Sequence, residues 1–259
     1  MSARVPDPQR KPPLIPPKMK RAAWALLSSC CVLVLEKEAV ASEGASAYPA
    51  IPEPMVFDMM RPLGAARGEM EVNALGVAPL SGESRVIPWA PELEYAFADG
   101  YAIEFELPFE NGSLREYKLG LQGAFGTFNG GRTAHGVQYL GIYERDSTDY
   151  MSSLLYMLGH RYDGGWSTMS MIGLGDIRFG GGHGRNSLLV NHSTFWSARR
   201  TTLGLEINYQ GGSERGVLVM PQIHQRLPAS FNLQFGVGVE KLRHDTTRPN
   251  LGLRLVREL

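Results

Sequence analysis

Cysteine is almost absent from this chain of 259 residues, and its two copies, Cys30 and Cys31, stand side by side near the beginning. We expect both to be removed with a leader segment, which leaves a mature chain without cysteine. Such a chain has no disulfide framework, no thiolate metal site and no cysteine nucleophile. These classes of site are therefore excluded from the expected mature protein.

An excess of positive charge is also lacking. The whole chain has 26 Lys and Arg against 26 Asp and Glu. Residues 1–41 hold seven of the basic and three of the acidic residues, so the remainder has 19 against 23 and a net charge of −4. A surface of this kind offers no general attraction to a phosphate backbone, and we expect no nucleic-acid partner.

No apolar run is long enough to cross a bilayer as a helix. Residues 22–35 come nearest, but the run is short and interrupted by serine. It follows Lys20-Arg21 and precedes the small-x-small sequence of residues 39–41, the pattern of a secretory signal peptide. We therefore expect residues 1–41 to be a signal peptide with an N-terminal extension. An alternative is a lipobox that ends at Cys30, which would be lipidated.

From residue 68 onward, apolar and polar residues alternate in segments of about ten residues, separated by turns rich in Gly, Asn, Asp and Pro. Residues 92–97 and 101–107 each place Leu, Ile, Tyr or Phe on one face and Glu or Ala on the other, with the hairpin signal Asp99-Gly100 between them, of the primed-turn kind. No helical period competes. Strands are expected near residues 69–78, 90–98, 101–108, 115–128, 134–145, 149–161, 166–179, 186–197, 200–210, 215–226, 229–242 and 249–258.

A transmembrane β-barrel accounts for these segments better than a soluble β-sandwich. Several segments exceed the five or six residues of a typical globular strand and match a tilted bilayer crossing. Aromatic residues gather near the segment ends, as in the interfacial girdles of such barrels. We expect an all-β, antiparallel barrel of about 12 strands, with ten possible, over residues 68–259. Its expected location is the cell outer membrane of a Gram-negative bacterium, in contact with outer-membrane lipid.

The segment between leader and barrel is rich in proline. Residues 42–67 contain Pro49, Pro52, Pro54 and Pro62. Because proline cannot donate a ladder hydrogen bond, this segment is predicted to lie outside the barrel wall. Two alternatives remain for it, a periplasmic tail and a short plug.

Three stretches resemble known outer-membrane barrels. Gly-Leu-Gly-Asp and the strand after it, residues 173–180, resemble a segment common in barrels described as transporters, including those linked to uptake of aromatic or hydrophobic compounds. Residues 53–73 resemble the opening of uncharacterised proteobacterial barrels. The final residues, 251–259, resemble the C-terminal signal for the barrel-assembly machinery, with Leu259 in place of the usual aromatic residue and Arg257 at a usually apolar position. These resemblances imply fold, location and an assembly partner, but no substrate.

Catalytic and metal sites are not expected. Lipid hydrolases of this class resemble one another in a His-x-Ser pair, which is lacking: Ser193 is adjacent to His192, and Thr194 at the right spacing is a poorer nucleophile. The glycine-rich residues 180–185 are not followed by Lys-Ser/Thr or a helix, unlike a phosphate-binding loop. The six histidines lack ligand spacing. We therefore predict no enzyme, no metal and no cofactor.

Charged and amide side chains on the polar face are the strongest functional candidates. In an open barrel they would face the lumen and set the selectivity of a narrow, porin-like channel or transporter for small solutes. In a closed barrel they would pair with one another, and the protein would be a structural or interaction barrel. A periplasmic or lipidated β-sandwich that binds a ligand is the third alternative. The lumen and selectivity candidates are Glu94, Glu104, Glu106, Lys118, Gln122, Asp176, Arg178, Glu206 and Arg254.

Overall fold

The computed structural model describes residues 48–81, 86–178, 186–212, 215–243 and 247–259. The predicted signal peptide and the alternative lipidation of Cys30 lie outside these ranges. Within them, no helical segment is both long and apolar enough to cross a membrane. One 3-10 turn, η2 (Asp163–Gly165), is present.

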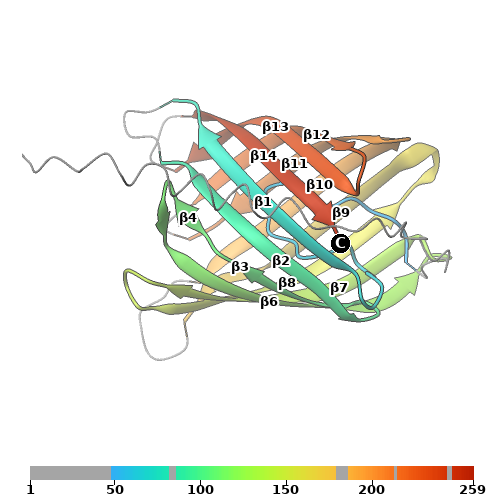
Figure 1. Cartoon of the computed structure of the whole chain (residues 1–259), viewed down its shortest axis with the longest axis horizontal. Helices are drawn as coiled ribbons and strands as arrows, with labels where there is room; N and C mark the ends of the chain where they lie inside the picture. Colours follow the sequence, from blue (N-terminus) through green and yellow to red (C-terminus); the bar gives the residue numbers. More distant parts are fainter. Residues whose placement is uncertain (1–47, 82–85, 179–185, 213–214, 244–246) are drawn as a thin grey trace, which may run out of the picture. The chain divides into compact units, whose positions relative to one another are not determined.

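Twelve antiparallel strands form one closed barrel (Figure 1). Each strand pairs with its neighbours in chain order, and β1 closes the ring by pairing with both β2 and β14. A small hairpin of two short strands, β4 (Phe109–Glu110) and β5 (Ser113–Leu114), extends from β2. The barrel strands are β1 (Met70–Pro79), β2 (Pro88–Ala98), β3 (Tyr101–Glu106), β6 (Glu116–Phe128), β7 (Thr133–Glu144), β8 (Tyr150–Arg161), β9 (Trp166–Ile177), β10 (Ser187–Ala198), β11 (Thr201–Gln210), β12 (Gly216–Arg226), β13 (Phe231–Leu242) and β14 (Arg248–Glu258).

The predicted fold class is confirmed, and the predicted strand ends lie within about two residues of those observed. The prediction of a primed turn at Asp99-Gly100 is wrong, although a hairpin does form there. Such a turn needs positive φ at its first central residue, but here only Gly100 has positive φ (77°). The strand register also shifts between Ala96 and Ala98, so the hairpin closes through a bulge.

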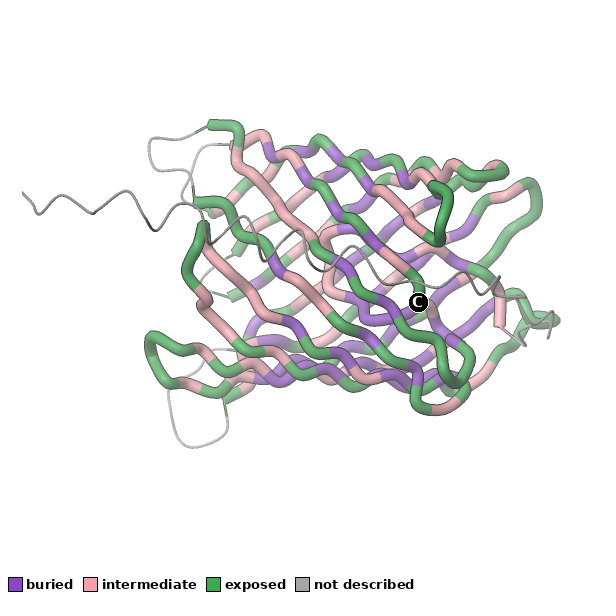
Figure 2. Tube along the Cα trace, viewed as in Figure 1, coloured by how far each residue is buried: buried purple, intermediate pink, exposed green. Residues whose placement is uncertain are grey.

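The outer face of the barrel is apolar, and the inner face carries polar and small residues together with several buried methionines and Phe195. On β2, Leu93 is 45% exposed and Glu94 is fully buried, and on β11 Leu205 is 42% exposed and Glu206 fully buried. The same alternation runs around the wall in Figure 2. In water this arrangement would expose the apolar faces to solvent, which is unfavourable. In a bilayer it places them against lipid. The β-sandwich alternative is therefore wrong, because the apolar faces do not pack against a second sheet.

The two ends of the barrel differ. At the end where β1 begins and β14 ends, the turns between strands are short, from two residues (99–100) to four (162–165). At the other end the connections are longer, for example residues 107–115 between β3 and β6. Short turns face the periplasm in bacterial barrels, and longer loops face outward. Aromatic residues mark both ends: Trp166 pairs with Trp196 at the short-turn end, and Trp89 stacks on Phe109 at 4.6 Å at the long-loop end.

Residues 48–67, here called the plug, lie inside the barrel. Figure 1 shows this blue segment within the ring of strands, and its central side chains are buried. It enters beside the turns of the short-turn end, where Tyr48 packs against Gly100, and it returns to the same end to begin β1. Ile51, Met59 and Leu63 of the plug join a buried apolar cluster with Met157, Met169, Met171 and Phe195 of β8, β9 and β10.

Candidate functional site

A single wall carboxylate binds the tip of the plug. Oε2 of Glu206 on β11 accepts hydrogen bonds from the backbone amides of Met55 (2.8 Å) and Val56 (3.1 Å), and Oε1 accepts one from Phe57 (2.6 Å). Three consecutive amides thus converge on one buried charge. Hydrogen bonds to a charged group are stronger than neutral ones, so Glu206 fixes the position of the plug tip.

Two wall glutamines pair with the plug backbone as a neighbouring strand would. Gln138 on β7 donates to the carbonyl of Asp58 (2.8 Å) and accepts from the amide of Met60 (3.3 Å). Gln122 on β6 donates to the carbonyl of Arg61 (2.8 Å) and accepts from its amide (3.4 Å). These side chains satisfy backbone groups that the proline-rich plug leaves without ladder partners.

Glycines in the wall make room for plug side chains. A Cβ added to Gly120 would lie 2.0 Å from Cε of Met60, and one added to Gly252 would lie 2.4 Å from Cε of Met55. A Cβ added to Gly159 would lie 2.6 Å from Cδ1 of Ile51. Because any larger residue would overlap the plug at these points, the wall and the plug are shaped to each other.

Ion pairs connect the plug with β1, β6 and β14. Arg61 of the plug lies 2.5 Å from Glu71 and 2.9 Å from Glu69. Arg254 on β14 lies 3.3 Å from Glu53 of the plug. Lys118 on β6 bridges Asp58 of the plug (3.3 Å) and Glu106 of β3 (2.9 Å). Each of the three cations thus forms an ion pair between the plug and the barrel wall.

Acidic groups outnumber basic ones in this part of the lumen. Burial, together with the nearby carboxylate of Glu71, raises the pKa of Glu53 to about 8. The cations of the cluster are Arg61, Lys118 and Arg254. The carboxylates are Glu53, Asp58, Glu71, Glu92, Glu94, Glu104 and Glu106. In this cluster, seven acidic side chains thus accompany three basic ones.

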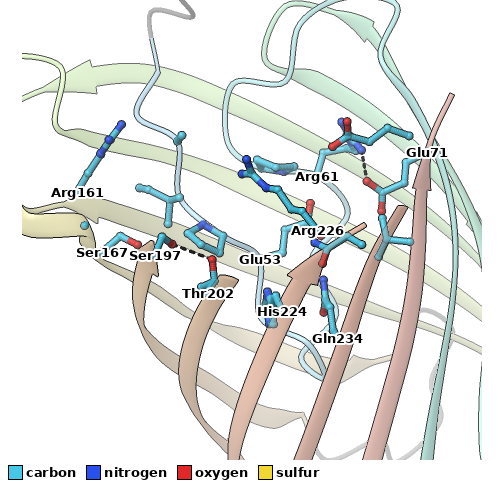
Figure 3. Close-up of a pocket in the computed structure, with 18 of the residues that line it drawn as sticks. Glu53, Arg61, Glu71, Arg161, Ser167, Ser197, Thr202, His224, Arg226 and Gln234 are labelled. Atoms are coloured by element: carbon cyan, nitrogen blue, oxygen red, sulfur yellow. Dashed lines mark hydrogen bonds and ion pairs between the residues drawn. The ribbon is translucent and has the colours of Figure 1, made fainter. Parts of the chain in front are cut away.

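A cavity of about 350 Å³ lies between the plug and the wall at the short-turn end. Its lining combines polar and apolar surface in nearly equal parts, with Glu53 and Arg61 from the plug facing Glu71, His224 and Gln234 from the wall (Figure 3). Ser197 and Thr202, 2.9 Å apart, extend the polar lining across β10 and β11. This space is large enough to hold several water molecules, so the plug and the wall side chains do not fill the lumen completely.

Seven of the nine predicted lumen residues are buried or half-buried around the plug. They are Glu94, Glu104, Glu106, Lys118, Gln122, Glu206 and Arg254. The other two lie apart from this cluster. Asp176 has a positive φ of 54° next to the end of β9, and the half-exposed Arg178 follows that end and pairs with Asp149. A role in selectivity remains a prediction for all nine.

Several residues of the site escape prediction from the sequence. Glu71 shares the alternating inner face of its strand with Asn73, so its period-two position was a usable signal. Gln138 on β7 carried the same signal. Glu53, Asp58 and Arg61 had none, because the plug has no regular period.

Comparison with known proteins supports the fold. No protein-family model matches the chain, and no curated protein matches its sequence. Among solved structures, the chain is similar to the COG4313 outer membrane channel from Pseudomonas putida F1, with 12% identity, a TM-score of 0.57, and 76% of this chain and 98% of that one covered. It is also similar to the KdgM porin, with 10% identity, a TM-score of 0.55, and 71% and 97% covered.

The barrel, its apolar outer surface and these two likenesses define the class of protein. The chain has the porin-like fold of outer-membrane β-barrel channels, and its predicted location in the outer membrane is confirmed. At 10–12% identity the likeness is one of fold.

Proposed function

We propose that the protein is an outer-membrane channel for small solutes, with the plug as its constriction. The observation that carries this proposal is the cavity of about 350 Å³, with charged and polar groups in its lining, which remains between the plug and the wall. A barrel whose only role was structural would have no need of an unfilled space next to a docked plug. The leader, residues 1–41, would export the chain, and the terminal strand would present it to the barrel-assembly machinery.

Selectivity for cations is part of this proposal. The carboxylates around the plug outnumber the three cations, so a solute that passes the plug would meet a net negative potential. The KdgM porin has also been solved in complex with disordered oligogalacturonate, an acidic ligand. The charge balance of the present lumen favours the opposite sign of solute.

Conductance across a planar lipid bilayer tests the proposal. We expect small ohmic steps from the full protein, larger steps after deletion of residues 48–67, and a reversal potential in a salt gradient that indicates cations. Glu106→Gln should weaken the cation preference. Glu144→Gln is the matched control, because Glu144 bonds to Ser147 in the connection after β7. Silence of both the full protein and the deletion would contradict a channel and favour a structural barrel.

A further inference from the structure

Like charges face each other across the β2–β3 hairpin. Glu94 is directly opposite Glu104, and Glu92 is directly opposite Glu106, all four on the lumen side. Carboxylates in directly opposite positions repel each other and destabilise a strand pair. The hairpin therefore needs compensating positive charge.

The basic residues of the lumen supply only part of this charge. Arg254 lies 3.4 Å from Glu94 and 3.5 Å from Glu92, but it also binds Glu53. Lys118 is shared between Glu106 and Asp58. Among the residues that the structure describes, none forms an ion pair with Glu104, although Glu104 is only 1% exposed.

Two buried carboxylate oxygens of this group have no hydrogen-bond partner in the described part of the chain. They are Oε1 of Glu104 and Oε2 of Glu94. Buried polar atoms nearly always have a partner, and an unpaired buried carboxylate is strongly unfavourable. Oxygen atoms from Glu92, Glu94 and Glu104 also lie within 4.8 Å of one another. The two residues with unpaired oxygens thus belong to a single group of three converging carboxylates.

We propose that Glu92, Glu94 and Glu104 bind a calcium ion in the lumen. The ligands are all carboxylate oxygens, which hard cations prefer and which lack the nitrogen or sulfur typical of zinc sites. Calcium–oxygen distances are about 2.3–2.6 Å, so two oxygens on opposite sides of the ion are roughly 4.6–5.2 Å apart. Magnesium, with distances of about 2.0–2.1 Å, requires a tighter octahedron. Three carboxylates within 4.8 Å of one another fit calcium, which accepts several carboxylates in flexible geometry, whereas magnesium is usually held by one or two.

The bound ion would also act on the plug. Glu104 belongs to a second group of close carboxylates with Glu106 and Asp58 of the plug, again within 4.8 Å. Calcium at Glu104 lowers the negative charge that Asp58 meets when the plug docks. Calcium binding and plug docking should therefore stabilise each other.

Calorimetric titration of the purified, detergent-folded protein with calcium chloride, after treatment with a chelator, tests this site. We expect one saturable site in the wild type and an affinity at least tenfold lower in Glu104→Gln. Glu240→Gln is the matched control, because Glu240 faces the lumen on β13 and bonds to Asn250, away from the three ligands. It should bind calcium as the wild type does.

Absence of saturable binding by the wild type, equal affinity for magnesium, or unchanged affinity in Glu104→Gln would overturn the proposal. Heat-modifiable gel migration shows whether each variant is folded, and Glu94→Gln serves as the second ligand variant. Because the readout is binding and not conductance, its outcome is separate from that of the proposed channel function.

Discussion

The carboxylate of Glu206 lies 2.8 Å from the backbone amide of Met55, although the two residues are 151 positions apart in the chain. This hydrogen bond connects the middle of the barrel wall with the tip of the plug. In an open, water-filled barrel, a side chain at this position would face solvent. Here it determines where the plug stops, and so it determines the shape of the lumen.

Replacement of Glu206 by Ala should release the plug tip. The change removes the acceptor of three backbone hydrogen bonds, each of which contributes about 1.5–3 kcal/mol when the acceptor is charged. We expect larger conductance steps and faster cleavage by chymotrypsin after Phe57 in folded protein. Glu240→Gln changes the lumen charge without touching the plug and should leave both unchanged. Equal cleavage of Glu206→Ala and wild type would show that Glu206 does not hold the plug.

The alternating residues of the strands were predictable from the sequence, because a strand repeats every two residues and the bilayer requires opposite faces to differ. Leu93 and Glu94 show this directly, since their types alone assign one to lipid and the other to the lumen. The docked path of the plug could not be predicted in this way. Its prolines exclude a strand but do not choose between a tail and a plug, and its contacts with Glu206 and Gln138 join distant parts of the chain.

The glycines show the same limit. Period-two alternation assigns Gly252 to the lumen face, where a small residue is also compatible with an open, wet channel. Only the three-dimensional structure shows that Met55 occupies the space beside it. The strand pattern thus predicts which face a residue occupies, but it does not predict which plug side chain packs against that residue.

Gly252→Leu should displace the plug and leave the barrel intact. The new Cβ would lie 2.4 Å from Cε of Met55, and no backbone atom of the wall is among its nearest neighbours. Overpacking of this kind typically costs about 1–3 kcal/mol. We expect increased conductance, with heat-modifiable migration like that of the wild type. Unchanged conductance would mean that Met55 moves aside at no loss to plug docking.

Gly173→Ala should instead weaken the barrel wall. A Cβ at this position would lie 1.9 Å from the carbonyl oxygen of Leu154 on the neighbouring strand, so the backbone itself must shift. We expect the temperature at which the folded band disappears from a gel to fall clearly. Gly76→Ala is the matched control on β1, since its Cβ would meet atoms no closer than 3.6 Å. A similar loss in both variants would contradict the steric explanation.

A charge on the outer face should be unfavourable in proportion to its depth. Leu205 lies near the middle of β11 and is 42% exposed on the apolar face, so Leu205→Arg should lower the free energy of unfolding from vesicles by about 2–4 kcal/mol. Leu203→Arg, two residues nearer the short-turn end on the same face, should cost less. Denaturant titration in lipid vesicles measures both. Equal losses would contradict the placement of this face across the bilayer.

Unequal losses of stability are expected when the two partners of the Arg254–Glu53 pair are replaced one at a time. Arg254 is buried, lies 3.3 Å from Glu53 and is also close to Glu92 and Glu94, so Arg254→Met leaves several carboxylates without their cation. Loss of one partner of a buried ion pair typically costs about 3–5 kcal/mol. Glu53→Gln removes one of the surplus acidic groups and should lower stability by less than about 1 kcal/mol, or raise it, because Arg254 keeps its other partners. Denaturant titration of the two single variants and the double variant measures the coupling between them. If Glu53→Gln lowered stability as much as Arg254→Met, the excess of acidic groups in the lumen would not explain how the plug is held.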